Sequence, residues 1–144
     1  MLQIVRKIFR KFWIIGWFFI KLWNTFIYCI YYKEAIVVNA EMRQRCLQIV
    51  KSNFGDDLNF YLISALTGKH VFNYNSFFHQ KMDNFVCIGS VVEDMCDEKS
   101  IVWGGGVMHP DYTGYKLPQK VTATRGPLTR EWLISKGICP PRLW

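Results

Sequence analysis

The segment from residue 120 to residue 140 constrains the fold of this chain more than any other part of its sequence. Val121 and Thr122 favour a β-strand, and Pro127 suits the first position of a helix, where its missing N–H group costs no hydrogen bond. Gly137 is a residue at which such a helix ends. The apolar residues that recur at helical spacing between these points are Leu128, Trp132 and Leu133. The segment therefore predicts a strand that turns sharply into a helix.

Two arginines, Arg125 and Arg130, lie at this predicted turn. Open α/β sheets bind ligands at the carboxyl ends of their strands, and the first turn of a helix offers backbone N–H groups to an anion. A guanidinium also binds phosphate or carboxylate through two parallel hydrogen bonds. The turn therefore predicts an anion or sugar site. The alternative is that the arginines pair with Asp111 or Glu131 of the chain itself.

Strands and helices alternate along the rest of the chain. Strands are expected over residues 35–38, 70–74, 85–88, 100–103 and 121–124. Residues 53–59 are expected to form a loop leading into a helix that ends at Thr67-Gly68-Lys69, while residues 40–52 are polar and only partly helical in pattern, so their structure stays open. The expected buried face of that helix is Leu58, Tyr61, Leu62 and Leu66. This alternation predicts the α/β class with a Rossmann-like parallel sheet.

The chain has 144 residues, enough for one domain with a core of its own. We expect that domain over residues 35–144 and a separate N-terminal helix over residues 1–34. The five cysteines and three histidines show neither a CxxC pair nor metal-ligand spacing, so no metal and no cofactor is expected. Scattered thiols in apolar surroundings are typical of a reducing cytosol.

The N-terminal helix is rich in aromatic residues and carries much of the net charge of +7. At ~100° per residue, its basic residues fall within an arc of roughly 140°. They are Arg6, Lys7, Arg10, Lys11 and Lys21. A helix lying in the plane of a membrane fits this pattern, with aromatic residues at the headgroups and basic residues on anionic lipid. The expected location is therefore cytoplasmic, peripheral on the inner face of the plasma membrane.

Other interpretations of this helix stay open. A helix that spans the bilayer needs ~20 apolar residues and has to accommodate Lys21 near its centre, at ~2.5–3.5 kcal/mol. A signal peptide needs a cleavage site of small residues, and none follows here. The helix can also pack on the protein as part of a soluble domain. A nucleic-acid partner is not expected, because no motif of the chain interleaves aromatic and basic residues.

Four motifs follow one another along roughly residues 35–140. They are NFGDDLN (Asn53–Asn59), IGS (Ile88–Ser90), VWGGG (Val102–Gly106) and ATRGPLTR (Ala123–Arg130), the last followed by a helix and KGICP. In their residues and their order they resemble the polysaccharide pyruvyl transferase family. The resemblance implies two Rossmann-like domains in a glycosyltransferase B-type arrangement, of which this chain covers the N-terminal, acceptor-side domain.

The resemblance also implies an activity. Members of the family move the pyruvyl group of phosphoenolpyruvate onto two hydroxyls of one sugar of a cell-surface glycan, as a ketal. The implied partners are phosphoenolpyruvate, bound through a second domain, and a glycan or lipid-linked sugar. Because the donor-binding half is missing from the sequence, we expect a truncated chain that does not turn over alone. The alternatives are a non-catalytic membrane-associated module that binds glycan or completes a split enzyme, and half of a nucleotide-sugar glycosyltransferase.

Each motif contributes candidate site residues. Asp56 and Asp57 are the candidate catalytic residues, since a carboxylate can act as general base for a sugar hydroxyl. The candidate substrate-binding residues are Asn53, Gly55, Ser90, Gly104, Gly105, Gly106, Arg125 and Arg130. Structural roles are the alternative, with one aspartate capping a helix and the glycines forming tight turns.

Overall fold

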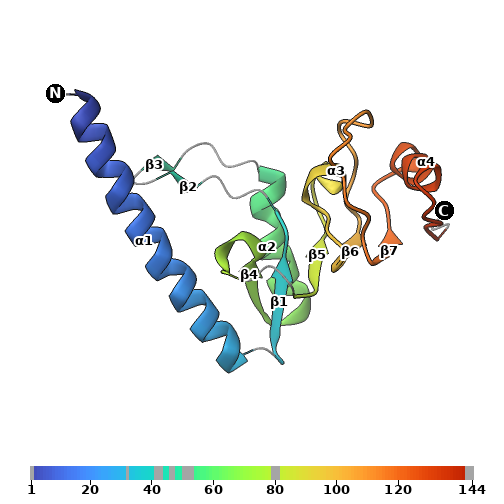
Figure 1. The fold of residues 1–144 in the computed structure, drawn as a ribbon. Coiled ribbons are helices and arrows are strands. Elements are labelled where there is room, and N and C mark those ends of the chain that lie inside the picture. Colours follow the sequence, from blue (N-terminus) through green and yellow to red (C-terminus); the bar gives the residue numbers. More distant parts are fainter. Residues whose placement is uncertain are drawn as a thin grey trace.

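The computed structural model describes residues 2–31, 33–40, 44–45, 48–49, 54–78 and 82–141, and for residues 2–13, 44–45 and 48–49 it describes the backbone alone. Its helices are α1 (Leu2–Tyr31), α2 (Phe54–Thr67), the short η1 (Tyr74–Ser76), α3 (Val92–Met95) and α4 (Pro127–Ser135). Its strands are β1 (Ala35–Val38), β2 (Gln44–Arg45), β3 (Gln48–Ile49), β4 (His70–Asn73), β5 (Asn84–Val86), β6 (Ser100–Trp103) and β7 (Lys120–Ala123) (Figure 1).

Five strands form one parallel sheet in the order β4-β1-β5-β6-β7, while β2 and β3 form a separate antiparallel pair. The predicted α/β class with a parallel sheet is thereby confirmed. In chain order the five strands are arranged 2-1-3-4-5, so the direction of winding reverses between β1 and β5. Val38 pairs with Phe85 at this point, and the Asn39 N–H donates to the Phe85 carbonyl at 2.8 Å. Ligands of such sheets bind beside this reversal, outside the carboxyl ends of the strands.

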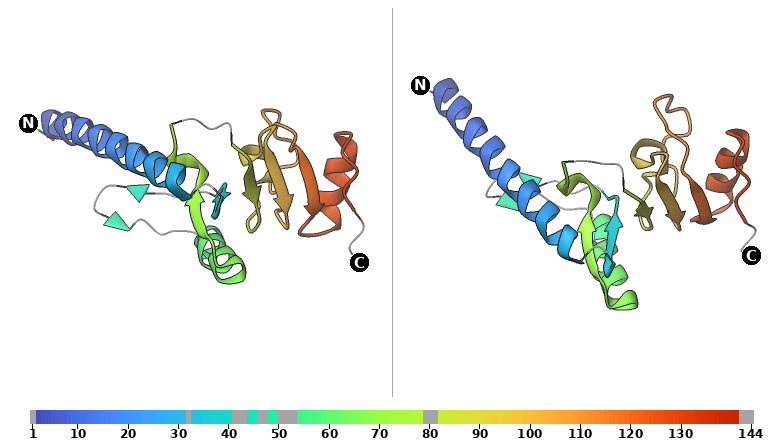
Figure 2. Two further views of the ribbon diagram at one scale, coloured as in Figure 1. Left: turned by 90° about the horizontal axis from the view of Figure 1, so that it is seen from below. Right: turned by 60° about the horizontal axis from the view of Figure 1, so that its bottom comes forward.

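Different elements cover the two faces of the sheet. On one face Val86 and Val102 are neighbours, and they pack in one apolar cluster with residues of α3 and α4. On the other face Val38 and Cys87 pack against Ile63 of α2. Figure 2 shows α1 and α2 on opposite sides of β1 and β4. Successive side chains of each strand point to opposite faces, so the core has one apolar layer on each side of the sheet.

Helix α2 begins at Phe54, so Gly55, Asp56 and Asp57 lie in its first turn and not in a loop before it. That part of the prediction is wrong. Negative charge in the first turn is favourable, because the backbone N–H groups there carry partial positive charge. A helix can therefore start before these aspartates as well as after them.

The buried residues of α2 are Asp56, Asn59 and Ile63. The predicted buried face is wrong at Tyr61 and Leu66, which are 78% and 62% exposed. Both sets recur at helical spacing, so sequence alone does not choose between them. The choice comes from Asn59, whose hydrogen bonds to the strand end set the rotation of the helix.

Both long helices of the domain end at glycine, as predicted. Gly68 has a φ of 65° after α2, and Gly137 a φ of 87° after α4. Of the three apolar residues that recur at helical spacing in α4, Trp132 and Leu133 are buried, whereas Leu128 is 79% exposed. Of the three, Trp132 and Leu133 belong to the core cluster, because it is the later turn of α4 that packs against the sheet.

Two of the cysteines should resist alkylation in the folded protein. Cys87 and Cys96 are buried, and burial raises the pKa of each thiol to about 12, so almost no thiolate forms at pH 8. The exposed thiols of Cys29 and Cys139 should react. Mass-spectrometric mapping of iodoacetamide adducts, in native buffer and in guanidinium chloride, measures this. Rapid native labelling of Cys87 would contradict its buried position.

Candidate functional site

Three strands of the sheet end in loops that come together. β5 is followed by Gly89 and Ser90, β6 by Gly104–Gly106, and β7 by Arg125. The Gly106 N–H donates to the Gly89 carbonyl at 2.8 Å, which ties the first two loops together. The Arg125 N–H donates to the Gly105 carbonyl in the loop after β6 at 3.2 Å, which joins the third loop to the other two. We refer to Asp56, Gly89, Ser90, Gly104, Gly105, Gly106 and Arg125 as the strand-end cluster.

Two of the glycines are required by the packing of the loop itself. Gly104 has a φ of 108°, and a Cβ on it would lie 3.0 Å from the carbonyl oxygen of Cys87. A Cβ on Gly105 would lie 2.9 Å from Val92 Cγ2, inside the core. Gly104 packs too close to the Cys87 backbone for a side chain, and Gly105 packs too close to the core. The structural alternative therefore accounts for Gly104 and Gly105.

Gly106 has a different neighbour, the guanidinium of Arg125. A Cβ on Gly106 would lie 2.9 Å from Arg125 Nε and 3.1 Å from its Cζ, so the absence of a side chain leaves the space that the guanidinium occupies. Arg125 Nη1 donates a hydrogen bond to the Ser90 hydroxyl, 35 residues earlier in the chain. Among the described residues Ser90, rather than Asp111 or Glu131, is the hydrogen-bond partner of this side chain. Arg125 is also exposed, so an anion in solution can reach it.

Asn59 holds the first turn of α2 against the end of β5. Its Oδ1 accepts from the Ile88 N–H at 2.8 Å, and its Nδ2 donates to the Ile88 carbonyl at 2.9 Å. The buried side-chain amide thus makes the two hydrogen bonds to the Ile88 backbone that a neighbouring strand would otherwise make. As a result Asp56, which is 1% exposed, lies beside Gly89, where a Cβ would be 3.0 Å from Asp56 Oδ1.

Three predicted site residues lie outside the strand-end cluster, and a fourth cannot be compared with it. Asp57 is exposed on the first turn of α2, and the Gly55 carbonyl accepts from Asn59 Nδ2 at 3.1 Å within the same helix. Arg130 is half-buried in α4, and in the described part of the chain no hydrogen bond links its side chain to the strand-end cluster. Asn53 lies outside the described residues.

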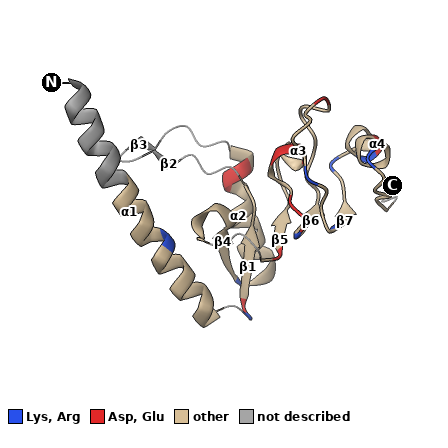
Figure 3. Ribbon diagram, viewed as in Figure 1, with Lys and Arg blue, Asp and Glu red and all other residues tan. Residues whose placement is uncertain are grey.

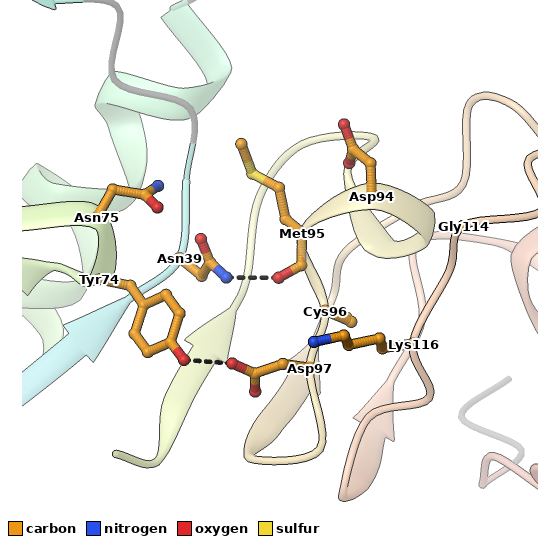
Figure 4. Close-up of a pocket in the computed structure, with 9 residues that line it drawn as sticks. All are labelled: Asn39, Tyr74, Asn75, Asp94, Met95, Cys96, Asp97, Gly114 and Lys116. Atoms are coloured by element: carbon orange, nitrogen blue, oxygen red, sulfur yellow. Dashed lines mark hydrogen bonds between the residues drawn. The ribbon is translucent and has the colours of Figure 1, made fainter. Parts of the chain in front are cut away.

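A polar pocket of about 360 Å³ lies where β1 and β4 end (Figure 4). Asn39 and Tyr74, which follow those strands, lie across from Asp97 and the end of α3 in this view. Asn39 Nδ2 donates to the Met95 carbonyl, and the Tyr74 hydroxyl donates to Asp97 Oδ2. The complete lining is Asn39, Tyr74, Asn75, Asp94, Met95, Cys96, Asp97, Gly114 and Lys116. The position of Asn39, directly after the first strand, is the one sequence signal that could have indicated this pocket.

Asp97 lines this pocket and is the acceptor that several neighbouring donors share. Besides Tyr74, its carboxylate accepts from Asn84 Nδ2 at 3.1 Å, from Ser100 Oγ at 3.1 Å and from the Lys99 N–H at 2.8 Å. Burial acts to raise the pKa of Asp97, but the hydrogen bonds from Tyr74 and the other donors outweigh it and lower the pKa. Burial and the same carboxylate raise the pKa of Tyr74 far above its usual range. Asp97 is therefore a stable anion with a structural role, and a poor general base.

Glu93 is a further buried carboxylate that the motifs do not include. Its Oε1 accepts from the backbone N–H groups of Met108 and His109, at 2.8 and 2.6 Å. Thr129 of α4 accepts from the Val107 N–H at 3.1 Å. These contacts hold the loop after the three glycines in place, and with it the position of Gly106 under Arg125.

Within the described residues no group of three or more histidine, cysteine or acidic side chains is arranged to hold a metal ion. The strand-end cluster instead offers an exposed guanidinium, a hydroxyl and a nearby buried carboxylate, a set suited to an anion next to a hydroxyl-bearing ligand. Comparison of the chain with protein-family models, curated proteins and solved structures finds no match.

Proposed function

We propose that the domain of residues 35–144 serves a ketal pyruvyl transferase, in which it binds the acceptor sugar and contributes an arginine to an anionic group of the donor. The observation that carries the proposal is the contact of Arg125 with Ser90 over Gly106. These residues come from three of the four motifs that resemble the family, and they meet at the strand ends. A site of this composition suits the phosphate or carboxylate of phosphoenolpyruvate.

The reaction defines what the site has to provide. Two sugar hydroxyl oxygens form bonds to C2 of phosphoenolpyruvate, and the bond from C2 to the phosphate oxygen breaks. One hydroxyl proton passes to the methylene carbon, which becomes a methyl group, and the other leaves with phosphate. The step therefore needs a base near the hydroxyls, an acid near the methylene carbon and cations at the phosphate and carboxylate.

Asp56 is the better candidate for the base of the two aspartates. Its carboxylate is buried and lies beside Gly89 in the strand-end cluster, whereas Asp57 is exposed. Arg125 is the candidate cation, since its guanidinium is exposed and held by one hydrogen bond to Ser90. The polar pocket at the ends of β1 and β4 offers amide and carboxylate groups to sugar hydroxyls.

Thermal unfolding of the full chain tests the proposal. Phosphoenolpyruvate at ten times its dissociation constant should raise Tm by about 4 °C, because a ligand that binds the folded state alone stabilises it. Arg125→Ala should abolish the shift, while Lys120→Ala, which removes an exposed cation of β7, should keep it. A shift with uridine diphosphate glucose and none with phosphoenolpyruvate would support a nucleotide-sugar transferase instead. No shift with either ligand would contradict the assignment of Arg125 to an anionic group of the donor.

A further inference from the structure

Helix α1 has two sides that differ in what they contact. Between residues 14 and 31 its half-buried residues are Trp17, Lys21, Asn24, Thr25, Ile27 and Tyr28, most of them on one helical stripe. This stripe faces the domain: the ring of Tyr28 lies 5.2 Å from that of Phe77 and 5.9 Å from that of Phe72. The polar residues of the helix, Lys21 included, are therefore on the side where the domain docks.

The opposite side of α1 is apolar and exposed. Its large side chains are Ile15, Phe19, Leu22, Trp23, Phe26 and Ile30, with Phe18 at the edge next to the domain, and we call these seven residues the apolar face of α1. Within residues 14–31 Lys21 is the one charged residue, and it appears as a single blue band on the described part of α1 (Figure 3). Soluble proteins seldom expose so large a continuous apolar surface, which marks a site of interaction.

By length and composition, residues Ile14–Tyr31 could cross a membrane, and none of them is fully buried in the protein. The docking of the domain decides against a crossing orientation. Phe18 contacts Phe78, Tyr28 contacts Phe72 and Tyr31 contacts His70, so the domain lies along the same stretch of helix. A spanning α1 would carry β4, an edge strand of the sheet, and η1 into hydrocarbon, where unpaired backbone groups are strongly unfavourable.

We propose that the apolar face of α1 binds the surface of an anionic lipid bilayer, with the helix axis in the membrane plane and the domain docked on its other side. Charge agrees with this occupant. The sequence places Arg6, Lys7, Arg10 and Lys11 directly before the apolar stretch of residues 14–31, and basic residues close to inserted apolar side chains are attracted to anionic headgroups. The proposal does not depend on the activity proposed above.

The domain adds one residue of its own to this surface. The ring of Phe78 lies 5.1 Å from that of Phe18 and is partly exposed, next to the apolar face of α1. A bilayer that covers Phe18 therefore covers Phe78 as well. Membrane contact of Phe78 distinguishes a docked domain from one that hangs from the helix on a flexible connection.

Flotation of the full chain with vesicles of phosphatidylglycerol and phosphatidylcholine tests the proposal. Trp23→Ser combined with Phe26→Ser should weaken binding about 100-fold, roughly tenfold for each side chain withdrawn from the bilayer. Phe78→Ser should weaken it severalfold. The matched control is Tyr61→Ser with Leu66→Ser, which changes two equally exposed apolar residues of α2 and should leave binding unchanged. Equal loss in both double variants, or loss in neither, would overturn the proposal.

Two further results would also overturn it. If the Trp23/Phe26 variant loses self-association in sedimentation but keeps its vesicle binding, the apolar face pairs with a second copy of the chain. If α1 spans the bilayer, thiols introduced by Gln3→Cys and Lys33→Cys lie on opposite sides of a sealed vesicle. An in-plane helix instead leaves both thiols open to a membrane-impermeant maleimide from outside, as mass mapping of the labelled sites would show.

Discussion

Replacing Leu133 by alanine should lower the free energy of unfolding by about 2–5 kcal/mol, the range for emptying a leucine site in a packed core. Leu133 is 0% exposed and lies in the core cluster with Val86, Val102 and Val121. The side chain joins α4 to three neighbouring strands of the sheet. Its loss removes apolar burial and leaves a cavity, and both effects act in the same direction. Urea unfolding followed by circular dichroism measures the change.

The matched control lies on the same helix. Leu128→Ala removes the same atoms from a residue that is 79% exposed, so the free energy of unfolding should change by less than about 0.5 kcal/mol. Similar losses in the two variants would show that α4 is rotated relative to the sheet. Helical spacing alone does not tell the buried leucine from the exposed one, and the comparison measures that difference.

Asp97→Ala should lower the free energy of unfolding by about 3 kcal/mol. The substitution removes the acceptor for Tyr74, Asn84, Ser100 and the Lys99 N–H at once. Ser100 Oγ keeps a second acceptor, Asn84 Oδ1 at 2.8 Å, but Asn84 Nδ2 keeps only the Met82 carbonyl at 3.4 Å. Asn84 is fully buried, and a buried donor left without a good acceptor costs ~1–3 kcal/mol. Asp83→Ala is the control, because Asp83 is an exposed carboxylate next to the same strand. Equal effects of the two substitutions would contradict the network.

The effect of Asp97 should depend on pH in a defined direction. Its pKa is lower in the folded protein than the ordinary value of 3.8, so the unfolded chain binds this proton first as pH falls. The stability it contributes is therefore complete above about pH 5 and is lost as pH falls through the folded pKa. The difference in unfolding free energy between the wild type and Asp97→Ala should shrink below pH 4. A difference that stays constant down to pH 2 would show that the carboxylate is not held as an anion.

Local patterns in the sequence predict the elements of this fold closely. Strand-forming runs such as 35–38 and 100–103 are strands, and glycines 68 and 137 end helices. These features depend on neighbouring residues alone, because dihedral preferences and side-chain alternation act over a few positions. The parallel class agrees with the alternation of strands and helices, although β6 and β7 are joined by residues 104–119, in which the structure has no helix. The order of the strands does not follow from local patterns. This order determines that the direction of winding reverses between β1 and β5.

For the candidate site, sequence supplied the residues and tertiary structure selected among them. Asp56 and Asp57 are adjacent and chemically equal in the sequence, yet Asn59 turns α2 so that Asp56 is buried and Asp57 is exposed. Arg125 and Arg130 are equally suited to an anion, yet Arg125 is the one that contacts Ser90. The pocket beside Asp97 carried almost no sequence signal, because its lining comes from segments that only the sheet brings together.

The sequence by itself determined the α/β class, most helix and strand positions and the amphipathic character of α1, all of which rest on spacing along the chain. Tertiary structure decided which side of each helix is covered. In α1 it placed the domain against Tyr28 and left Trp23 and Phe26 exposed, and in α4 it buried Leu133 and exposed Leu128. The physical reason is that helical spacing defines candidate faces, while burial depends on contacts with distant strands whose order no local pattern encodes.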